Sequence, residues 1–174
     1  MIMASNGTQS FTDMPVKSVM TKDVRTVEVG KPLIECVAMM KRFNIGSLVV
    51  VENEKPVGIF TERDLVRKLA NGYATLGVEV SKVMSKPLTV ISPNTTLWEA
   101  ITLMGRLNIR RLPIVESDRL LGILTETDVL RLVIAHQYLI IESVSESLPS
   151  ITKEKLKAIS GHFGGERPTP RTEE

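Results

Sequence analysis

The sequence predicts a mixed α/β (α+β) fold in which two similar β-α-β-β-α units pack sheet to sheet. The strongest observation is an internal repeat, because GIFTERD at 58–64 returns as GILTETD at 122–128, 64 positions later. A second observation is that short β-branched runs alternate with apolar stripes at helical spacing in both halves. Hydrophobic residues make up 43% of the 174, enough for the two units to share a core.

Each half begins with an extended Thr-Val stretch, at 26–27 and at 89–90, followed by a turn that contains Gly or Pro. Pairing these two stretches implies that the second half has lost one residue just upstream of its own stretch. Apolar residues then recur at helical spacing from Leu33 and from Leu97. This periodicity predicts one amphipathic helix in each half.

A β-branched run follows each of these helices and is too short to be helical itself. Each run is joined by a polar turn to a second strand that leads into the heptad, so we expect one hairpin per half. The expected strand pairs are 48–51 with 57–60 and 112–115 with 121–124, and closing helices are expected at 62–69 and 126–135.

Capping signals stand at the helix starts. Thr95 or Thr96 can accept a hydrogen bond from the first turn of the helix at Leu97, and Glu99 can complete a capping box. The threonine and aspartate of each heptad can likewise cap the closing helix that follows them. Capping is therefore one interpretation of the repeated residues.

The repeat divides the chain into six segments. Apolar residues at helical spacing predict a helix after the second repeat, and the Gly- and Pro-containing end has almost nothing to bury, which predicts disorder. The expected segments are an N-terminal extension at 1–15, a first repeat at 16–71, a linker at 72–79, a second repeat at 80–141, a C-terminal helical extension at 142–162 and a disordered tail at 163–174.

Composition narrows the classes of function. The formal charge of +2, from 22 basic and 20 acidic residues, lacks the basic excess that most nucleic-acid-binding proteins carry. The single cysteine, Cys36, cannot form an internal disulfide, which fits a cytoplasmic location. No apolar run approaches the roughly 18 residues of a membrane span. His136 and His162 lack partners at metal-ligand spacing, and no catalytic motif is visible, so we expect neither a metal site nor an enzyme.

The repeated heptad, Gly-hydrophobic-x-Thr-x-x-Asp, makes the chain resemble a tandem pair of CBS domains (the cystathionine β-synthase type of repeat) that stands alone. The resemblance implies pseudo-two-fold symmetry and clefts between the repeats that bind adenosine-containing ligands. The chemistry is consistent with this, because a carboxylate at a helix start can accept hydrogen bonds from two ribose hydroxyls while a threonine hydroxyl bonds ribose or phosphate.

The resemblance also implies which residues form the two clefts, since each cleft of a CBS pair is completed by the other repeat. The first, which we call the Asp64 cleft, is expected to hold Thr61, Arg63, Asp64, Pro87, Thr89, Ile109, Arg110 and Arg111. The second, the Asp128 cleft, is expected to hold Thr21, Thr26, Ile45, Gly46, Ser47, Thr125 and Asp128.

The two clefts are expected to differ in charge. Arg110 and Arg111 stand where the other repeat has Gly46 and Ser47, and arginine matches phosphate oxygens with paired donors. We therefore expect a phosphorylated adenine nucleotide in the Asp64 cleft. We expect adenosine with little charge, or no ligand, in the Asp128 cleft. A carboxylate at Glu62 would repel a triphosphate, which favours AMP or ADP over ATP.

The function expected from this pattern is a dimeric regulatory sensor whose adenine nucleotide changes its contact with a regulated protein partner. It requires no cofactor, and S-adenosylmethionine and NAD stay open as ligands. The competing hypothesis is a nucleic-acid-binding protein on a CBS scaffold, which would show steep salt dependence. No membrane contact is expected.

Overall fold

The computed structural model describes residues 11–70 and 77–135. The chain divides into two compact units, Met1–Val129 and Leu130–Glu174, and the architecture below is that of the first unit. The expected helical extension at 142–162 and tail at 163–174 lie outside the described residues, as do His136 and His162 and most of the expected linker.

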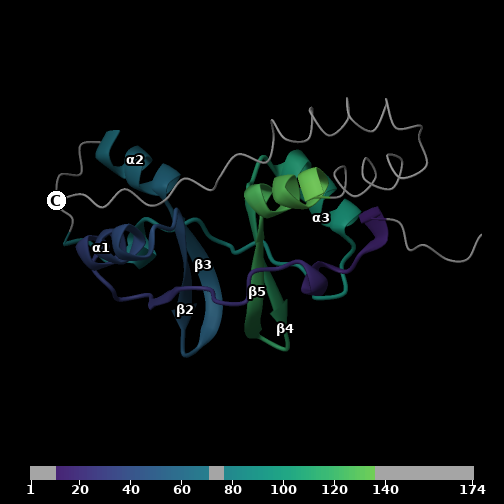
Figure 1. Ribbon diagram of the computed structural model, residues 1–174. Helices are drawn as coiled ribbons and strands as arrows, with labels where there is room; N and C mark the ends of the chain where they lie inside the picture. Colours follow the sequence, from purple (N-terminus) through teal and green to yellow (C-terminus); the bar gives the residue numbers. More distant parts are fainter. Residues whose placement is uncertain (1–10, 71–76, 136–174) are drawn as a thin grey trace, which may run out of the picture. The chain divides into compact units, whose positions relative to one another are not determined.

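The first half has the expected β-α-β-β-α order (Figure 1). Its sheet has the order β1-β2-β3, with β1 parallel to β2 and β2 antiparallel to β3. The predicted hairpin is therefore confirmed, as is the helix that precedes it. The elements are β1 Thr26–Glu28, α1 Leu33–Phe43, β2 Ser47–Glu52, β3 Lys55–Thr61 and α2 Glu62–Ala70.

The second half repeats the helix and the hairpin but not the full first strand. The elements are α3 Leu97–Leu107, β4 Arg111–Glu116 and β5 Arg119–Thr125, and residues 126–129, which follow β5 and end this unit, are helical. The strands β4 and β5 pair antiparallel, and the expected third strand is reduced to a single parallel bridge between Ile91 and Ile114.

Two prolines explain why this strand is so short. In the first half the N–H of Val49 donates to the carbonyl of Arg25, and the N–H of Val29 donates to the carbonyl of Val51, both at 3.1 Å. The residues 64 positions after Val49 and Val29 are Pro113 and Pro93. Because proline has no N–H, both flanking ladder bonds are lost and one bridge remains.

The same bridge corrects the expected alignment of the halves. Val27 pairs with Val50, and Ile91 pairs with Ile114, so both pairs keep the spacing of 64. Val27 and Ile91 are buried, whereas Val90 is exposed. The predicted loss of one residue in the second half is therefore wrong, and the true counterpart of Val27 is Ile91.

The amphipathic helices bury the predicted apolar stripe. In α1 this stripe is Leu33, Cys36 and Met40. The N-cap of α3 is Thr96, whose hydroxyl accepts from the N–H of Glu99, and the carboxylate of Glu99 accepts from the N–H of Thr96 at 2.9 Å. The predicted capping box is thus confirmed.

The segment that leads into each half, residues 14–21 or 78–85, is bound to the other half, and we call it the lead-in segment. The N–H of Val16 donates to the carbonyl of Thr95 at 2.9 Å, and the N–H of Val80 donates to that of Lys31 at 2.8 Å. In Figure 1 the N-terminal segment runs beside α3 rather than α1. This exchange relates the halves by pseudo-two-fold symmetry and brings each lead-in segment to the heptad of the opposite half.

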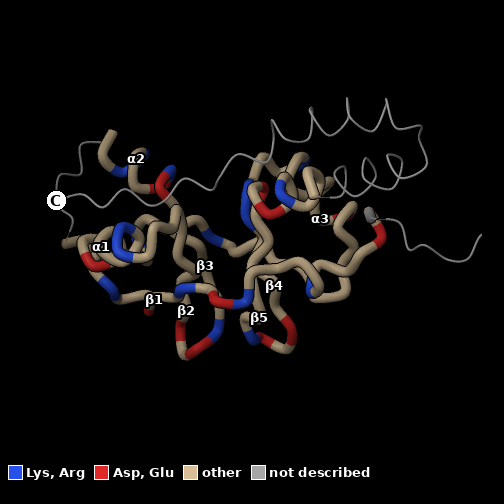
Figure 2. The backbone as a smooth tube through the Cα atoms, in the orientation of Figure 1, with Lys and Arg blue, Asp and Glu red and all other residues tan. Residues whose placement is uncertain are grey.

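The two sheets pack against each other. Val49 and Val51 of β2 form a buried cluster with Ile123 of β5. The hairpin turns, whose acidic and basic residues Figure 2 shows, are linked by a hydrogen-bonded ion pair of 2.8 Å between Lys55 and Asp118. The expected sheet-to-sheet arrangement is confirmed.

Candidate functional site

Each heptad closes a helix start with its own threonine and aspartate. The Oδ2 atom of Asp64 accepts from the N–H of Thr61 at 2.9 Å and from its hydroxyl at 2.6 Å, and the hydroxyl of Thr61 accepts from the N–H of Asp64. Thr125 and Asp128 repeat this geometry, at 3.0 and 2.6 Å. The capping interpretation therefore holds in both heptads and uses one carboxylate oxygen.

The glycine that opens each heptad lies against the lead-in segment of the other half. A Cβ added at Gly58 would overlap Sδ of Met84, and one added at Gly122 would lie 2.6 Å from Sδ of Met20. The same lead-in segments pair with the strands at Ile59 and Ile123 through two backbone hydrogen bonds each. At Gly122 the added Cβ would also lie 2.8 Å from the backbone oxygen of Thr21, so a side chain there requires the opposite half to move.

The Asp64 cleft has a volume of about 520 Å³, within the range of ligand-binding pockets. Asp64 is only 6% exposed, and its second oxygen, Oδ1, accepts from the hydroxyl of Ser85 at 2.9 Å. The structure brings together all the residues expected here, which are Thr61, Arg63, Asp64, Pro87, Thr89, Ile109, Arg110 and Arg111.

The Asp64 cleft is strongly basic. Its acidic residues are Glu62 and Asp64. With five basic and two acidic side chains its formal charge is +3, which attracts anions. The basic residues that line it are Arg63, Arg67, Lys86, Arg110 and Arg111.

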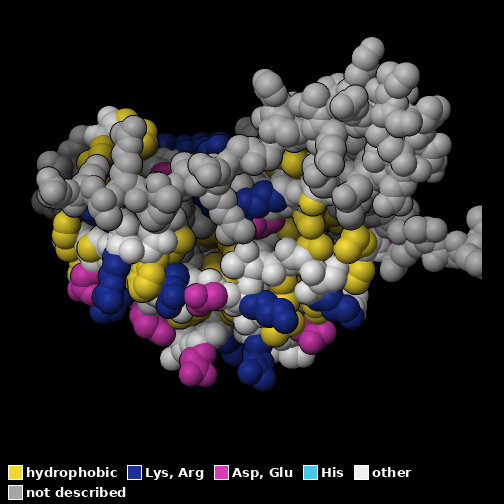
Figure 3. Space-filling model, in the orientation of Figure 1, with side chains coloured by type: hydrophobic (Ala, Val, Ile, Leu, Met, Phe, Trp, Pro, Cys, Tyr) yellow, Lys and Arg dark blue, Asp and Glu magenta, His cyan; other side chains and the backbone are white. Residues whose placement is uncertain are grey.

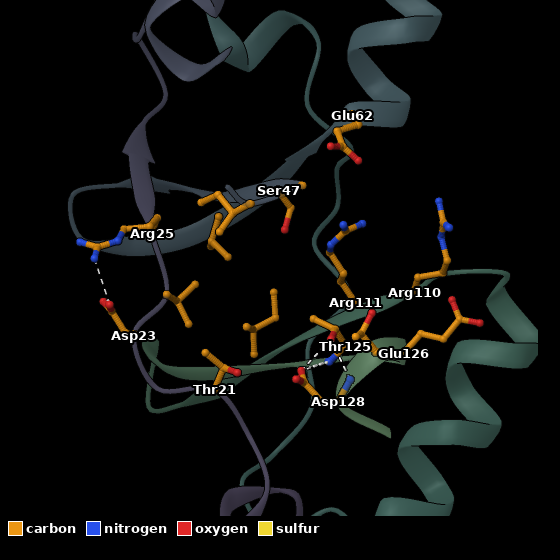
Figure 4. Close-up of a pocket in the computed structure, with 16 residues that line it drawn as sticks. Thr21, Asp23, Arg25, Ser47, Glu62, Arg110, Arg111, Thr125, Glu126 and Asp128 are labelled. Atoms are coloured by element: carbon orange, nitrogen blue, oxygen red, sulfur yellow. Dashed lines mark hydrogen bonds and ion pairs between the residues drawn. The ribbon is translucent and has the colours of Figure 1, made fainter. Parts of the chain in front are cut away.

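The Asp128 cleft is smaller, with a volume of about 310 Å³ (Figure 4). Thr26, which was also expected in this cleft, instead lies on β1 and lines a separate hollow beside α1. The residues that do line the Asp128 cleft as expected are Thr21, Ile45, Gly46, Ser47, Thr125 and Asp128.

The misplacement of Thr26 follows from the alignment error in the strand register. Thr89 lines the Asp64 cleft, and its counterpart at the true spacing of 64 is Arg25, which lines the Asp128 cleft. The Arg25 guanidinium forms an ion pair of 3.0 Å with Asp23 and lies 4.1 Å from the centre of the Phe43 ring. A cation–π contact and a carboxylate thus hold this arginine at the cleft.

The expectation that Arg110 and Arg111 line the Asp64 cleft alone is not met. Arg110, Arg111 and Glu62 line both clefts. In Figure 4 Arg111 extends from β4 toward Glu62. The charge difference between the clefts nevertheless persists, because the Asp128 cleft has three basic and four acidic side chains, a formal charge of −1. Its charged residues are Asp23, Arg25, Glu62, Arg110, Arg111, Glu126 and Asp128.

Arg111 is half-buried, and its guanidinium lies close to Gly46. Burial lowers the pKa of its guanidinium, the carboxylate of Glu62 acts in the opposite direction, and Arg110 and Arg63 add to the lowering. A Cβ added at Gly46 would lie 2.5 Å from Nη2 of Arg111 and 3.0 Å from Oε2 of Glu62. The absent side chain at Gly46 therefore makes room for the guanidinium, which stays charged at neutral pH.

Sequence reasoning missed Ser85 and Arg25 as residues of the clefts, and it placed Glu62 in the Asp64 cleft alone. Ser85 could have been found from the repeat, because it stands 64 positions after Thr21, which was expected in the other cleft. Glu62 lies inside the first heptad. Its place on both clefts became clear only from the structure, in which Arg111 of the second half extends toward it.

The described part of the chain contains neither a metal cluster nor a membrane-spanning helix. There, no three His, Cys, Asp or Glu side chains gather as a metal site would require. None of the helices in these residues is long and apolar enough to cross a membrane.

Comparison with known proteins agrees with the repeat. A family model described as "CBS domain" matches residues 16–71 and 80–135. CBS domain-containing protein YhcV of Bacillus subtilis is 33% identical over 141 residues, covering 81% of this chain and 97% of that protein. An uncharacterized protein of Methanopyrus kandleri is 38% identical over 119 residues, covering 67% of this chain and 61% of that protein.

A solved structure extends the comparison to ligands. The CBS domain pair of protein MJ0100, in complex with 5-methylthioadenosine and S-adenosyl-L-methionine, matches with a TM-score of 0.65 and 25% sequence identity. The match covers 71% of this chain and 98% of that one. Both of those ligands contain adenosine.

Proposed function

Because this chain belongs to the CBS-domain family and carries two copies of the domain, we propose that it is a regulatory module that binds adenosine-containing ligands in its two clefts. The bound ligand changes the balance between two arrangements of the module and so its contact with a regulated protein. The chain acts by binding rather than by catalysis, without a cofactor.

The Asp64 cleft takes a phosphorylated adenosine. The observation that carries this proposal is the charge of +3 on that cleft, against −1 on the Asp128 cleft. Arginine forks offer paired donors to phosphate oxygens, and the cleft volume of about 520 Å³ fits a small nucleotide. Glu62 on the cleft wall disfavours a triphosphate, so AMP or ADP is preferred to ATP.

Asp64 recognises the ribose. Its Oδ2 is used by the helix cap, so Oδ1 is the oxygen that accepts from a ribose hydroxyl. Ser85 donates to Oδ1, and a serine hydroxyl can rotate to a new acceptor when a ribose binds.

Isothermal titration calorimetry tests this proposal with AMP, ADP, ATP, S-adenosylmethionine and NAD as ligands. We expect AMP or ADP to bind the Asp128→Ala variant in the Asp64 cleft and to bind the Asp64→Ala variant at least about 10-fold more weakly, because a charged hydrogen bond is lost. Asp118→Ala is the matched control, since its carboxylate lies on an exposed hairpin turn.

The proposed function fails if none of these ligands binds the full chain, or if the two cleft variants and Asp118→Ala bind equally well. Tight binding of single-stranded nucleic acid with a steep salt dependence, and no adenosine ligand, would favour the nucleic-acid alternative.

A homodimer is the assembly we propose. Ile34 on α1 is 51% exposed and Trp98 on α3 is 60% exposed, and these two residues stand 64 positions apart. Figure 3 shows hydrophobic side chains at the surface over both the α1 and the α3 regions. Equivalent apolar surfaces on two similar halves suit a second copy related by a two-fold axis.

A further inference from the structure

Arg111 breaks the symmetry of the two halves. The residue 64 positions earlier is Ser47, whose short side chain cannot reach the opposite cleft. Arg111 instead extends from β4 of the second half toward Gly46 and Glu62 of the first (Figure 4). It lines the Asp64 cleft and the Asp128 cleft together with Arg110 and Glu62.

The Arg111 guanidinium has a fixed number of N–H donors to share between the two clefts. The Arg111 guanidinium presents paired N–H groups that match two phosphate oxygens. The carboxylate of Glu62 already attracts the guanidinium from one side. Because the same Nη groups cannot contact phosphates in both clefts at once, a phosphate in one cleft leaves fewer Arg111 donors for the other, and Glu62 adds a negative charge against a second phosphate.

We propose that the Arg111 guanidinium is a cationic arm shared by the two clefts, so that an anionic ligand in one cleft weakens the binding of an anionic ligand in the other. This inference rests on the proposed function. It concerns only charged ligands, because a neutral adenosine has no phosphate that binds the Arg111 guanidinium.

Stepwise titration calorimetry with AMP on the full chain measures this coupling. Asp64→Ala reports the affinity of the Asp128 cleft alone, and Asp128→Ala reports that of the Asp64 cleft alone. In the unaltered protein we expect the second AMP to bind about 5-fold or more weakly than the corresponding single-cleft variant predicts, the lower end of typical coupling between sites. With adenosine in place of AMP, the two clefts should fill independently.

Two variants test the arm itself. Arg111→Ala should weaken AMP in each cleft and bring the coupling factor close to one. Gly46→Ala removes no charge, but its Cβ would lie 2.5 Å from Nη2 of Arg111 and must displace the flexible guanidinium. It should therefore also bring the coupling factor toward one. Arg63→Ala is the control, because Arg63 lines the Asp64 cleft without lining the Asp128 cleft, and it should weaken AMP there while the coupling persists.

The outcomes separate the inference from the function beneath it. If both single-cleft variants bind AMP but the unaltered protein fills the clefts independently or with positive cooperativity, the shared arm is overturned and the proposed function stands. The shared arm is also overturned if Asp64→Ala binds adenosine but no AMP, or if Gly46→Ala and Arg111→Ala keep the full coupling. Absence of all adenosine-ligand binding overturns both proposals.

Discussion

Asp64 uses its two carboxylate oxygens for different purposes. One oxygen holds the start of α2, and the other accepts from Ser85, a residue of the opposite half. A buried carboxylate that loses a donor bears an uncompensated desolvation cost. The bond from Ser85 thus stabilises the Asp64 carboxylate and joins the two halves at the place where we propose that ribose binds.

Replacing Ser85 by alanine should therefore destabilise the ligand-free protein. We expect Ser85→Ala to lower the free energy of unfolding by about 1 kcal/mol, the usual cost of removing one partner of a buried polar group. Urea denaturation followed by circular dichroism measures the change. Ser81→Ala is the control, because the hydroxyl of Ser81 donates to the exposed Glu79, and it should cost less than about 0.5 kcal/mol. Equal costs for both variants would contradict the role of Ser85.

At the scale of elements, the two amphipathic helices differ in how they begin. Thr96 and Glu99 form a reciprocal capping box at the start of α3, whereas Pro32 at the start of α1 supplies no side-chain cap. Hydrogen bonds from the N–H and hydroxyl of Thr96 lower the pKa of the Glu99 carboxyl. A carboxyl with a lowered pKa in the folded state stabilises the fold above its unfolded pKa.

Removing the cap should have an effect that depends on pH. We expect Thr96→Ala to lower the free energy of unfolding by about 1 kcal/mol at neutral pH. The difference from the unaltered protein should shrink as the pH falls through the lowered pKa of Glu99, because a protonated carboxyl no longer attracts the Thr96 hydroxyl, the donor that the variant lacks. Denaturation at a series of pH values measures this. Thr95→Ala serves as a neighbouring control, and a pH-independent difference would rule out the contribution of Glu99.

At the scale of the whole molecule, neither half is complete without the other. The lead-in segment of each half forms hydrogen bonds with a strand and a helix start of the opposite half. The clefts lie where these exchanged segments meet the heptads. The helices α1 and α3 still leave large apolar side chains in contact with water. We propose that a second copy of the chain covers them.

A charge placed in this apolar surface should prevent dimer formation. We expect the unaltered protein to sediment as a dimer and Trp98→Arg to sediment as a monomer, because burial of an unpaired arginine is costly. Analytical ultracentrifugation at micromolar concentrations measures both. Val90→Arg, at an exposed apolar position outside α1 and α3, should remain dimeric. A monomeric unaltered protein would refute the proposed assembly.

Local patterns in the sequence determined much of this protein. Two kinds of element were predicted correctly, the amphipathic helices that begin at Leu33 and Leu97 and the two hairpins. Each depends on the spacing of neighbouring residues along one helix or strand. The capping box at Thr96 was predicted for the same reason. The residues of the Asp64 cleft followed from the family resemblance and stay a prediction as ligand contacts.

Only the tertiary structure decided the features that depend on pairing between distant segments. The effect of Pro113 on strand length could be recognised only from the pairing of the strand segments, in which Ile91 pairs with Ile114. The same pairing fixed the alignment of the two halves, and with it the position of Arg25 rather than Thr26 at the Asp128 cleft. The sharing of Arg111 by both clefts requires its reach to Gly46 across the pseudo-two-fold axis. Sequence spacing gives the order of residues along an element, whereas the direction of a long side chain is set by the space that the opposite half leaves for it.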